Sequence, residues 1–307
     1  MEQRIVSLLA SATEIVSALG YEDCLVGRSH ECDFPPSVAA LPVCSEPRID
    51  ISASSSEIDR QVKSSLQDAL SIYTVFKDQL KQLQPTVVIT QSQCEVCAVN
   101  LKDVEEAVCD LLESQPKIVS LLPMALADIW SDIQSVADAL DDSPAGQKLI
   151  EPLQGRLQQL ADSIPDTNPR PTVVCIEWLE PLMPAGNWIP ELVELAGGQS
   201  LLSEAGKHSP WITWEDLVKA NPDFIVIMPC GFGIERTRQE LHFLTEQPGW
   251  PGLKAVQNGN VFLTDGHQYF NRPGPRVVES AEILAEIFHG PAASYGHEGS
   301  GWVRADK

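Results

Sequence analysis

A histidine and three cysteines lie in polar segments shortly after predicted strands. The four residues are His30, Cys32, Cys94 and Cys97. Ligands collect at the carboxyl ends of the strands in an open parallel sheet. If the two preceding strands belong to one sheet, these four side chains are expected at the same edge. Three thiolates and one imidazole are typical of tetrahedral zinc or another thiophilic metal. The sequence therefore predicts a metal site formed by these residues.

The same residues allow other interpretations. A single CxxC, here Cys94 and Cys97, is also the pattern of a redox pair or of ordinary loop cysteines. His30 and Cys32 could act as base and nucleophile of a thiol-dependent enzyme, but no third, orienting group is evident. Imidazole is a good ligand for cobalt and iron, so His30 could instead reach the metal of a bound chelate.

Aromatic residues gather at predicted strand ends and in loops of the second half. Trp178 and Phe232 directly follow predicted strands, Trp188 stands in a Gly-Asn-Trp segment, and Tyr269 precedes a turn rich in proline and glycine. Large planar ligands are held mainly by aromatic and apolar contacts, with a few polar groups for orientation. Core packing is an equally good interpretation for any single tryptophan. We predict that these four aromatic residues contact the ligand.

Short apolar strands alternate with helical patterns along most of the chain. This order is typical of an α/β fold whose parallel sheets are covered by helices. The predicted strands cover residues 5–9, 25–27, 86–90, 117–121, 172–176, 224–228 and 261–264. The predicted helices cover residues 12–19, 55–83, 101–112, 189–196, 214–220, 235–245 and 275–288.

The middle of the chain has no strand pattern. An apolar stripe over residues 144–163 predicts one helix of about five turns. Residues 290–307 are rich in glycine, alanine, serine and charge, so they are expected to form a flexible tail. The predicted organisation is an α/β lobe over 1–122, a helical segment with the inter-lobe helix over 123–165, an α/β lobe over 166–289, and the tail.

Composition excludes several classes of partner. The 307 residues include 43 Asp and Glu against 21 Lys and Arg, a net charge of −22, which repels nucleic acid. No apolar run approaches the roughly 18 residues of a membrane helix, so direct membrane insertion is not expected. The first residues lack the positive charge of a signal peptide. We therefore expect a cytoplasmic protein, or a periplasmic one if a leader has been removed.

Several segments of the chain resemble a known family. Residues 4–20, Arg-Ile-Val-Ser-Leu-Leu-Ala-Ser-Ala-Thr-Glu-Ile-Val-Ser-Ala-Leu-Gly, resemble the first strand–helix unit of class III substrate-binding proteins. Those proteins serve ABC importers of vitamin B12, haem and iron–siderophores. The central helix, the segment 217–228 and the helix 275–288 fit the same family. Five segments resemble the branch usually labelled cobalamin-binding: 29–33, 91–97, 178–183, 186–188 and 270–276.

The resemblance carries several implications. It implies two Rossmann-like lobes with parallel sheets, joined by a single long rigid helix, with the ligand in the cleft between them. It implies a non-enzymatic protein that holds a cobalamin-like corrinoid or another metal chelate, with Arg272 facing an anionic group of that ligand. An ABC transporter permease would be the partner of an exported protein, whereas a cytoplasmic one would store, escort or sense the chelate. Binding of a bare metal ion and thiol chemistry stay as alternatives.

Overall fold

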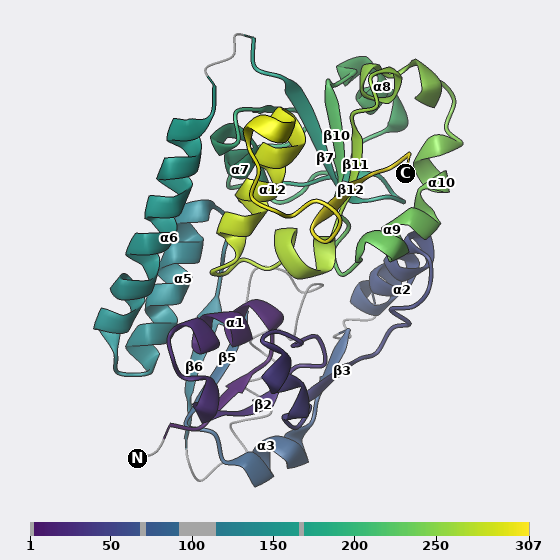
Figure 1. Ribbon diagram of the computed structural model, residues 1–307. Helices are drawn as coiled ribbons and strands as arrows, with labels where there is room; N and C mark the ends of the chain where they lie inside the picture. Colours follow the sequence, from purple (N-terminus) through teal and green to yellow (C-terminus); the bar gives the residue numbers. More distant parts are fainter. Residues whose placement is uncertain (1–2, 68–71, 92–114, 166–168, 307) are drawn as a thin grey trace. The chain divides into compact units, whose positions relative to one another are not determined.

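The chain folds into two compact α/β units, as the computed structural model in Figure 1 shows. The structure describes residues 3–67, 72–91, 115–165 and 169–306. The first unit comprises residues 1–53, 57–123 and 127–152, and the second comprises 54–56, 124–126 and 153–307. Helix α6, Ser143–Ser163, crosses the boundary between Pro152 and Leu153. The predicted fold class, α/β with parallel sheets, is confirmed.

The first unit is built on a parallel sheet with the strand order β2-β1-β5-β6. Its most central run is Val-Val-Ile-Thr in β5, which is fully buried because parallel sheets are covered on both faces. An antiparallel pair, β3 and β4, lies outside this sheet. The strands are β1 Ile5–Ser7, β2 Leu25–Arg28, β3 Ser45–Pro47, β4 Tyr73–Val75, β5 Val87–Gln91 and β6 Lys117–Leu121. The helices are α1 Ala10–Ala18, α2 Ser55–Gln67, α3 Lys77–Leu83 and α5 Leu126–Ala139, and the first residues of α2 and of α5 belong to the second unit.

The second unit has a mixed sheet with the order β12-β11-β10-β7-β8, and β9 pairs with β7. Strands β7, β10 and β11 are parallel, so their carboxyl ends lie at one edge. The strands are β7 Thr172–Trp178, β8 Met183–Pro184, β9 Gln199–Ser200, β10 Phe224–Ile227, β11 Val261–Thr264 and β12 Trp302–Arg304. The helices are α7 Ile189–Leu195, α8 Trp214–Ala220, α9 Ile234–Glu240, α10 His242–Thr245, α11 Lys254–Gln257 and α12 Val277–His289.

Two predictions about elements are wrong. The helix predicted over residues 55–83 is interrupted, because Tyr73–Val75 has β-forming side chains that pair with β3. The predicted flexible tail instead ends in a strand, because β12 pairs antiparallel with β11 and Trp302 is buried. The helix predicted over 101–112 lies outside the described residues.

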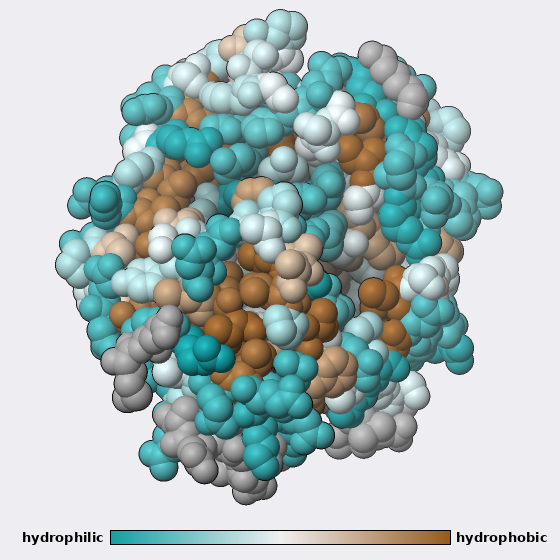
Figure 2. All heavy atoms as spheres, turned by 60° about the horizontal axis from the view of Figure 1, so that its bottom comes forward, coloured by the Kyte–Doolittle hydropathy of each residue, from teal (hydrophilic) through white to brown (hydrophobic). Residues whose placement is uncertain are grey.

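Polar residues cover most of the face drawn in Figure 2, and hydrophobic residues are visible between them. This distribution agrees with the large excess of carboxylates in the sequence. None of the helices among the described residues is both long and apolar enough to cross a membrane.

One carboxylate of the first unit is buried in an unfavourable environment. Asp132 on α5 is only 8% exposed, and its Oδ1 accepts the Leu122 N–H at 3.3 Å. Its Oδ2 has no hydrogen-bond partner within the described part of the chain. Burial raises the pKa of Asp132 to about 7, against the opposing effect of the Leu122 hydrogen bond. The charged form therefore destabilises the folded unit.

This raised pKa predicts a pH-dependent stability. The folded chain holds a proton on Asp132 at pH values where the unfolded chain has released it, so the free energy of unfolding should fall from about pH 4 to about pH 7. One such group contributes a slope of at most about 1.4 kcal/mol per pH unit. Urea unfolding should show that Asp132→Asn gains stability relative to the wild type across this window. The control, Glu151→Gln at an exposed position on α6, should follow the wild type, and a parallel Asp132→Asn profile would contradict the prediction.

Candidate functional site

Two aromatic rings meet at the carboxyl edge of the second unit's sheet. Trp178 is the last residue of β7, and Phe232 lies in the turn that follows β10. Their ring centroids are 5.4 Å apart with an interplanar angle of 51°. The Arg236 guanidinium lies 4.9 Å from the centroid of Phe232. We call these three residues the aromatic platform. It combines apolar ring surface with a positive charge.

Hydrogen bonds fix the platform from one side. The Trp178 indole donates to the Ser55 carbonyl at 3.2 Å and to the Glu180 carbonyl at 3.1 Å. The buried Glu240 carboxylate accepts the Ser55 N–H at 2.9 Å and pairs with Arg236 at 2.7 Å. Ser55 therefore ties Trp178 to the Arg236–Glu240 pair, so the platform is held by a connected polar network.

The loops after β10 and β11 are packed against each other. The His267 N–H donates to the Phe232 carbonyl at 3.1 Å. The Asn271 side-chain amide donates to the carbonyls of Met228 at 3.1 Å and Gly266 at 2.8 Å. A Cβ atom on Gly266 would lie 2.4 Å from the Pro229 carbonyl, so no larger residue fits this close approach. These contacts hold the loop after β10 against the loop after β11.

Arg272 and Tyr269 lie on the second of these loops. The buried Arg272 guanidinium lies 2.9 Å from His267 Nε2. Arginine is always a donor, so His267 Nε2 accepts this bond. The half-buried Tyr269 ring contacts the Arg276 guanidinium at 5.4 Å and the His297 ring at 6.1 Å. Both predicted residues thus lie at the carboxyl edge of β11, held by neighbours in their own unit.

The exposure of two tryptophans differs from what the predicted ligand contacts would require. Trp188 is only 5% exposed and precedes α7, so its ring is part of the packed interior. Trp211, by contrast, is 55% exposed. Its neighbour Ile212 donates its N–H to the Leu182 carbonyl at 3.1 Å, which fixes this segment beside the loop after β7. Arg236 was missed, and its signal was an Arg–Glu pair four residues apart after a Gly-Phe turn.

A small cavity lies in the second unit next to the loop after β7. It has a volume of about 170 Å³ and is lined by Leu179–Leu182, Ile212, Trp214 and residues of α10. Sites for drug-sized ligands usually occupy roughly 300 to 1,000 Å³. This cavity can therefore accommodate only a small group and cannot enclose a whole corrin or porphyrin.

His30 follows β2 at the carboxyl edge of the first unit's sheet. Its Nδ1 lies 3.2 Å from Ser45 Oγ and 3.4 Å from Ser29 Oγ, and its ring lies 5.4 Å from Tyr73. Its Nε2 has no hydrogen-bond partner among the described residues, and Glu31 Oε1 is 3.7 Å away. Burial lowers the pKa of His30, and the charge of Arg28 acts in the same direction, against a hydrogen bond at Ser45. The neutral imidazole is therefore favoured, and it retains a lone pair for a metal.

The structure describes two of the four residues of the predicted metal site, His30 and Cys32. Cys32 is buried, and its Sγ accepts a hydrogen bond from Thr13 Oγ1 at 2.9 Å. Cys94 and Cys97 lie outside the described residues. Among the residues that the structure describes, no three His, Cys, Asp or Glu side chains come together as metal ligands. The site stays a prediction, and no disulfide joins any two of the described cysteines, Cys24, Cys32, Cys44, Cys175 and Cys230.

Similar proteins of known name are binding proteins. A vitamin B12-binding protein of Vibrio cholerae serotype O1 is 23% identical over 290 residues, which cover 91% of this chain and 87% of that protein. A periplasmic heme binding protein from Pseudomonas aeruginosa matches with a TM-score of 0.71 at 21% identity, covering 96% of this chain and 95% of the other. An ABC transporter substrate-binding protein from Listeria monocytogenes EGD-e matches with a TM-score of 0.71 at 19% identity, covering 94% and 99%.

These similarities extend over both units and agree with the parallel sheets described above. The two solved structures support the fold, and all three proteins are named as binding proteins rather than enzymes. The family model described as "Periplasmic binding protein" matches residues 5–267, which is most of the chain. The chain therefore belongs to the periplasmic binding protein family.

Proposed function

We propose that this protein is the substrate-binding component of an ABC importer and binds a flat metal chelate, a corrinoid or a haem. The observation that carries the proposal is the aromatic platform at the carboxyl edge of β7 and β10. Ligands of open parallel sheets bind at this edge. The names of the relatives, which bind vitamin B12 and heme, support this ligand class.

The chemistry of the platform suits a macrocycle that carries carboxylates or amides. The half-buried Trp178 ring provides apolar contact area for a planar ligand, the buried Phe232 ring supports it from below, and Arg236, paired with Glu240, lies against Phe232. Arg272 and Tyr269 extend the same edge along β11. Arginine recognises carboxylates and phosphates by paired hydrogen bonds, so an anionic side group of the ligand would complement this edge. Trp188, buried in the interior, has no part in this proposal.

His30 is our candidate for direct contact with the metal of the chelate. Serine hydroxyls orient its Nδ1, and its Nε2 is without a hydrogen-bond partner in the described part of the chain. A neutral imidazole oriented through its other nitrogen is a common arrangement for a metal ligand. A bare metal ion held by His30, Cys32, Cys94 and Cys97 receives no support from the described residues.

We also propose that the protein acts outside the cytoplasm and delivers its ligand to an ABC permease. The family description and the name of the heme-binding relative both contain the word "periplasmic". The Listeria relative is named as an ABC transporter substrate-binding protein. The cytoplasmic location expected from the first residues finds no support among these relatives.

The first test is a spectroscopic titration of the purified, reduced protein with aquocobalamin and, separately, with hemin. We expect one of the two to give a saturable shift of the visible absorption near one equivalent. The higher-affinity ligand then identifies the chelate class. Unchanged spectra and unchanged thermal stability with both compounds would overturn the proposal.

Removing one platform ring should weaken the same titration. Trp178→Leu should raise the Kd by about 10- to 100-fold, because a buried aromatic contact at a binding site is worth about 1–3 kcal/mol. Trp130→Leu is the matched control, since Trp130 on α5 is also half-buried and is not among the residues of the candidate site. The control should bind like the wild type. Equal losses in the two variants would argue against the platform.

The His30 contact makes a separate prediction. His30→Gln should abolish the part of the spectral shift that reports an axial nitrogen on the metal, whereas His242→Gln at an exposed position should not. Because burial lowers the pKa of His30, the axial signal should persist at its ordinary pKa near 6.5 and disappear only at lower pH, as the imidazole takes up a proton. A His30→Gln spectrum identical to that of the wild type would exclude this role.

A further inference from the structure

The C-terminal segment of the second unit packs on the loop that carries part of the candidate site. After α12, the chain turns back and forms β12, which pairs with β11 from Thr264↔Trp302 to Phe262↔Arg304. The Trp302 ring contacts the Phe262 ring edge-on at 5.5 Å. The segment is therefore attached directly to the strand that leads into the loop containing His267 and Arg272.

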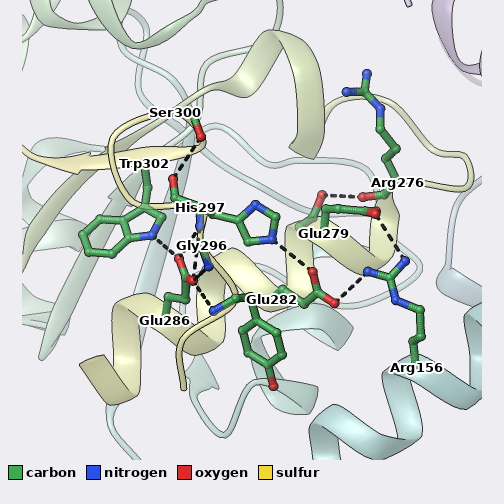
Figure 3. A network of polar contacts seen from close by, with 11 residues as sticks. Arg156, Arg276, Glu279, Glu282, Glu286, Gly296, His297, Ser300 and Trp302 are labelled. Atoms are coloured by element: carbon green, nitrogen blue, oxygen red, sulfur yellow. Dashed lines mark hydrogen bonds and ion pairs between the residues drawn. The ribbon is translucent and has the colours of Figure 1, made fainter. Parts of the chain in front are cut away.

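One buried carboxylate holds this segment in place. Glu286 on α12 is 5% exposed. Its Oε1 accepts the backbone N–H groups of Tyr295 and Gly296, each at 2.5 Å, and the His297 N–H lies 3.2 Å from both oxygens. Its Oε2 accepts the Trp302 indole N–H at 2.7 Å (Figure 3). A single side chain thus organises the backbone turn and the strand that follows it.

Charge strengthens this arrangement. Burial acts to raise the pKa of Glu286, but the hydrogen bonds from Trp302, Tyr295, His297 and Gly296 outweigh it and hold the pKa below its ordinary value. The carboxylate is therefore ionised at neutral pH. Hydrogen bonds to an ionised acceptor are stronger than neutral ones.

His297 connects the turn to the loop after β11. Its Nε2 lies 3.0 Å from Glu282 Oε2, and the other oxygen of Glu282 accepts from Arg156 at 2.7 Å (Figure 3). The His297 ring packs edge-on against Tyr269 at 6.1 Å. Just before β12, the Gly301 carbonyl accepts the Asp265 N–H at 2.9 Å. The segment thus contacts both the start and the middle of the loop.

We propose that residues 295–304 form a clamp that positions the ligand loop Asp265–Arg272, and that Glu286 and His297 are the positioning residues that hold it. The clamp itself does not contact the ligand. It fixes Tyr269 through the His297 ring and the loop backbone through Gly301. The part of the inference that concerns ligand affinity rests on the proposed function, whereas the part that concerns the loop does not.

The test compares Glu286→Gln with Glu279→Gln in the full chain. Glu279 lies on the same helix and contacts Arg156, and it has no hydrogen bond to the clamp (Figure 3). Hydrogen exchange measured by mass spectrometry should show at least about tenfold faster exchange in residues 265–272 of Glu286→Gln, since hydrogen bonds to a charged group contribute a factor of roughly 10 to 100. Glu279→Gln should exchange like the wild type in this loop.

Titration with the probe that binds the wild type, aquocobalamin or hemin, gives the second readout. The titration is carried out well below the melting temperature of each variant. The Kd of Glu286→Gln should then rise by about tenfold, and the Kd of Glu279→Gln should not change. Should Glu286→Gln fail to fold, Trp302→Phe keeps an aromatic ring near Phe262 and removes the indole donor together with part of the ring surface, and it should accelerate loop exchange by about fivefold.

Faster exchange in residues 293–304 with unchanged exchange in 265–272 would overturn the clamp, because it would show that the segment opens without disturbing the loop. Unchanged affinity in a variant whose loop has become mobile would overturn the claim that the clamp serves ligand binding. If the wild type binds neither probe, the proposed function fails, and the exchange data alone still decide whether the clamp positions the loop.

Discussion

The parallel registry of β7, β10 and β11 is the constraint on which the second unit depends. It brings three strand ends to one edge, and the loops that leave this edge can pack only because Gly266 leaves room for the Pro229 carbonyl. Asn271 then bonds both loops at once. Phe232, Tyr269 and Arg272 come from different parts of the chain, so their common location is a property of this backbone geometry rather than of any local motif.

This acidic chain buries some of its carboxylates, and it does so in two ways. Glu240 and Glu286 are buried but surrounded by donors, so each organises a stretch of backbone. Asp132 is buried with one oxygen lacking a partner in the described part of the chain. A buried charge is tolerated only where hydrogen bonds replace its lost hydration. The hydrogen bonds to Glu286 therefore favour its ionised form, whereas Asp132 favours the protonated form.

Most of the sheet could be predicted from the sequence, because β-branched runs such as Val87–Gln91 have few alternatives to a buried strand. The short strands β4 and β12 could not, because three residues are too few to show an apolar run or an alternation. The positions of Trp178 and Phe232 at the carboxyl edge of the sheet could be predicted because both follow apolar strands, and their role in binding stays a prediction. The burial of Trp188 could not be predicted, because burial of a ring depends on packing that no local pattern reports. The spacing of Arg236 and Glu240 is visible in the sequence, but the place of Arg236 over Phe232 arises only in the fold.

Strand β12 has a consequence for the behaviour of the protein at high concentration. Without it, the edge of the sheet would be β11, a Val-Phe-Leu-Thr strand that is buried along its whole length. An uncovered apolar edge of this kind pairs with other chains and promotes aggregation. The exposed edge is instead three residues long and ends in Arg304, whose guanidinium lies 4.9 Å from the Phe262 ring. The last few residues therefore protect the second unit from aggregation, and their removal would expose the apolar edge of β11.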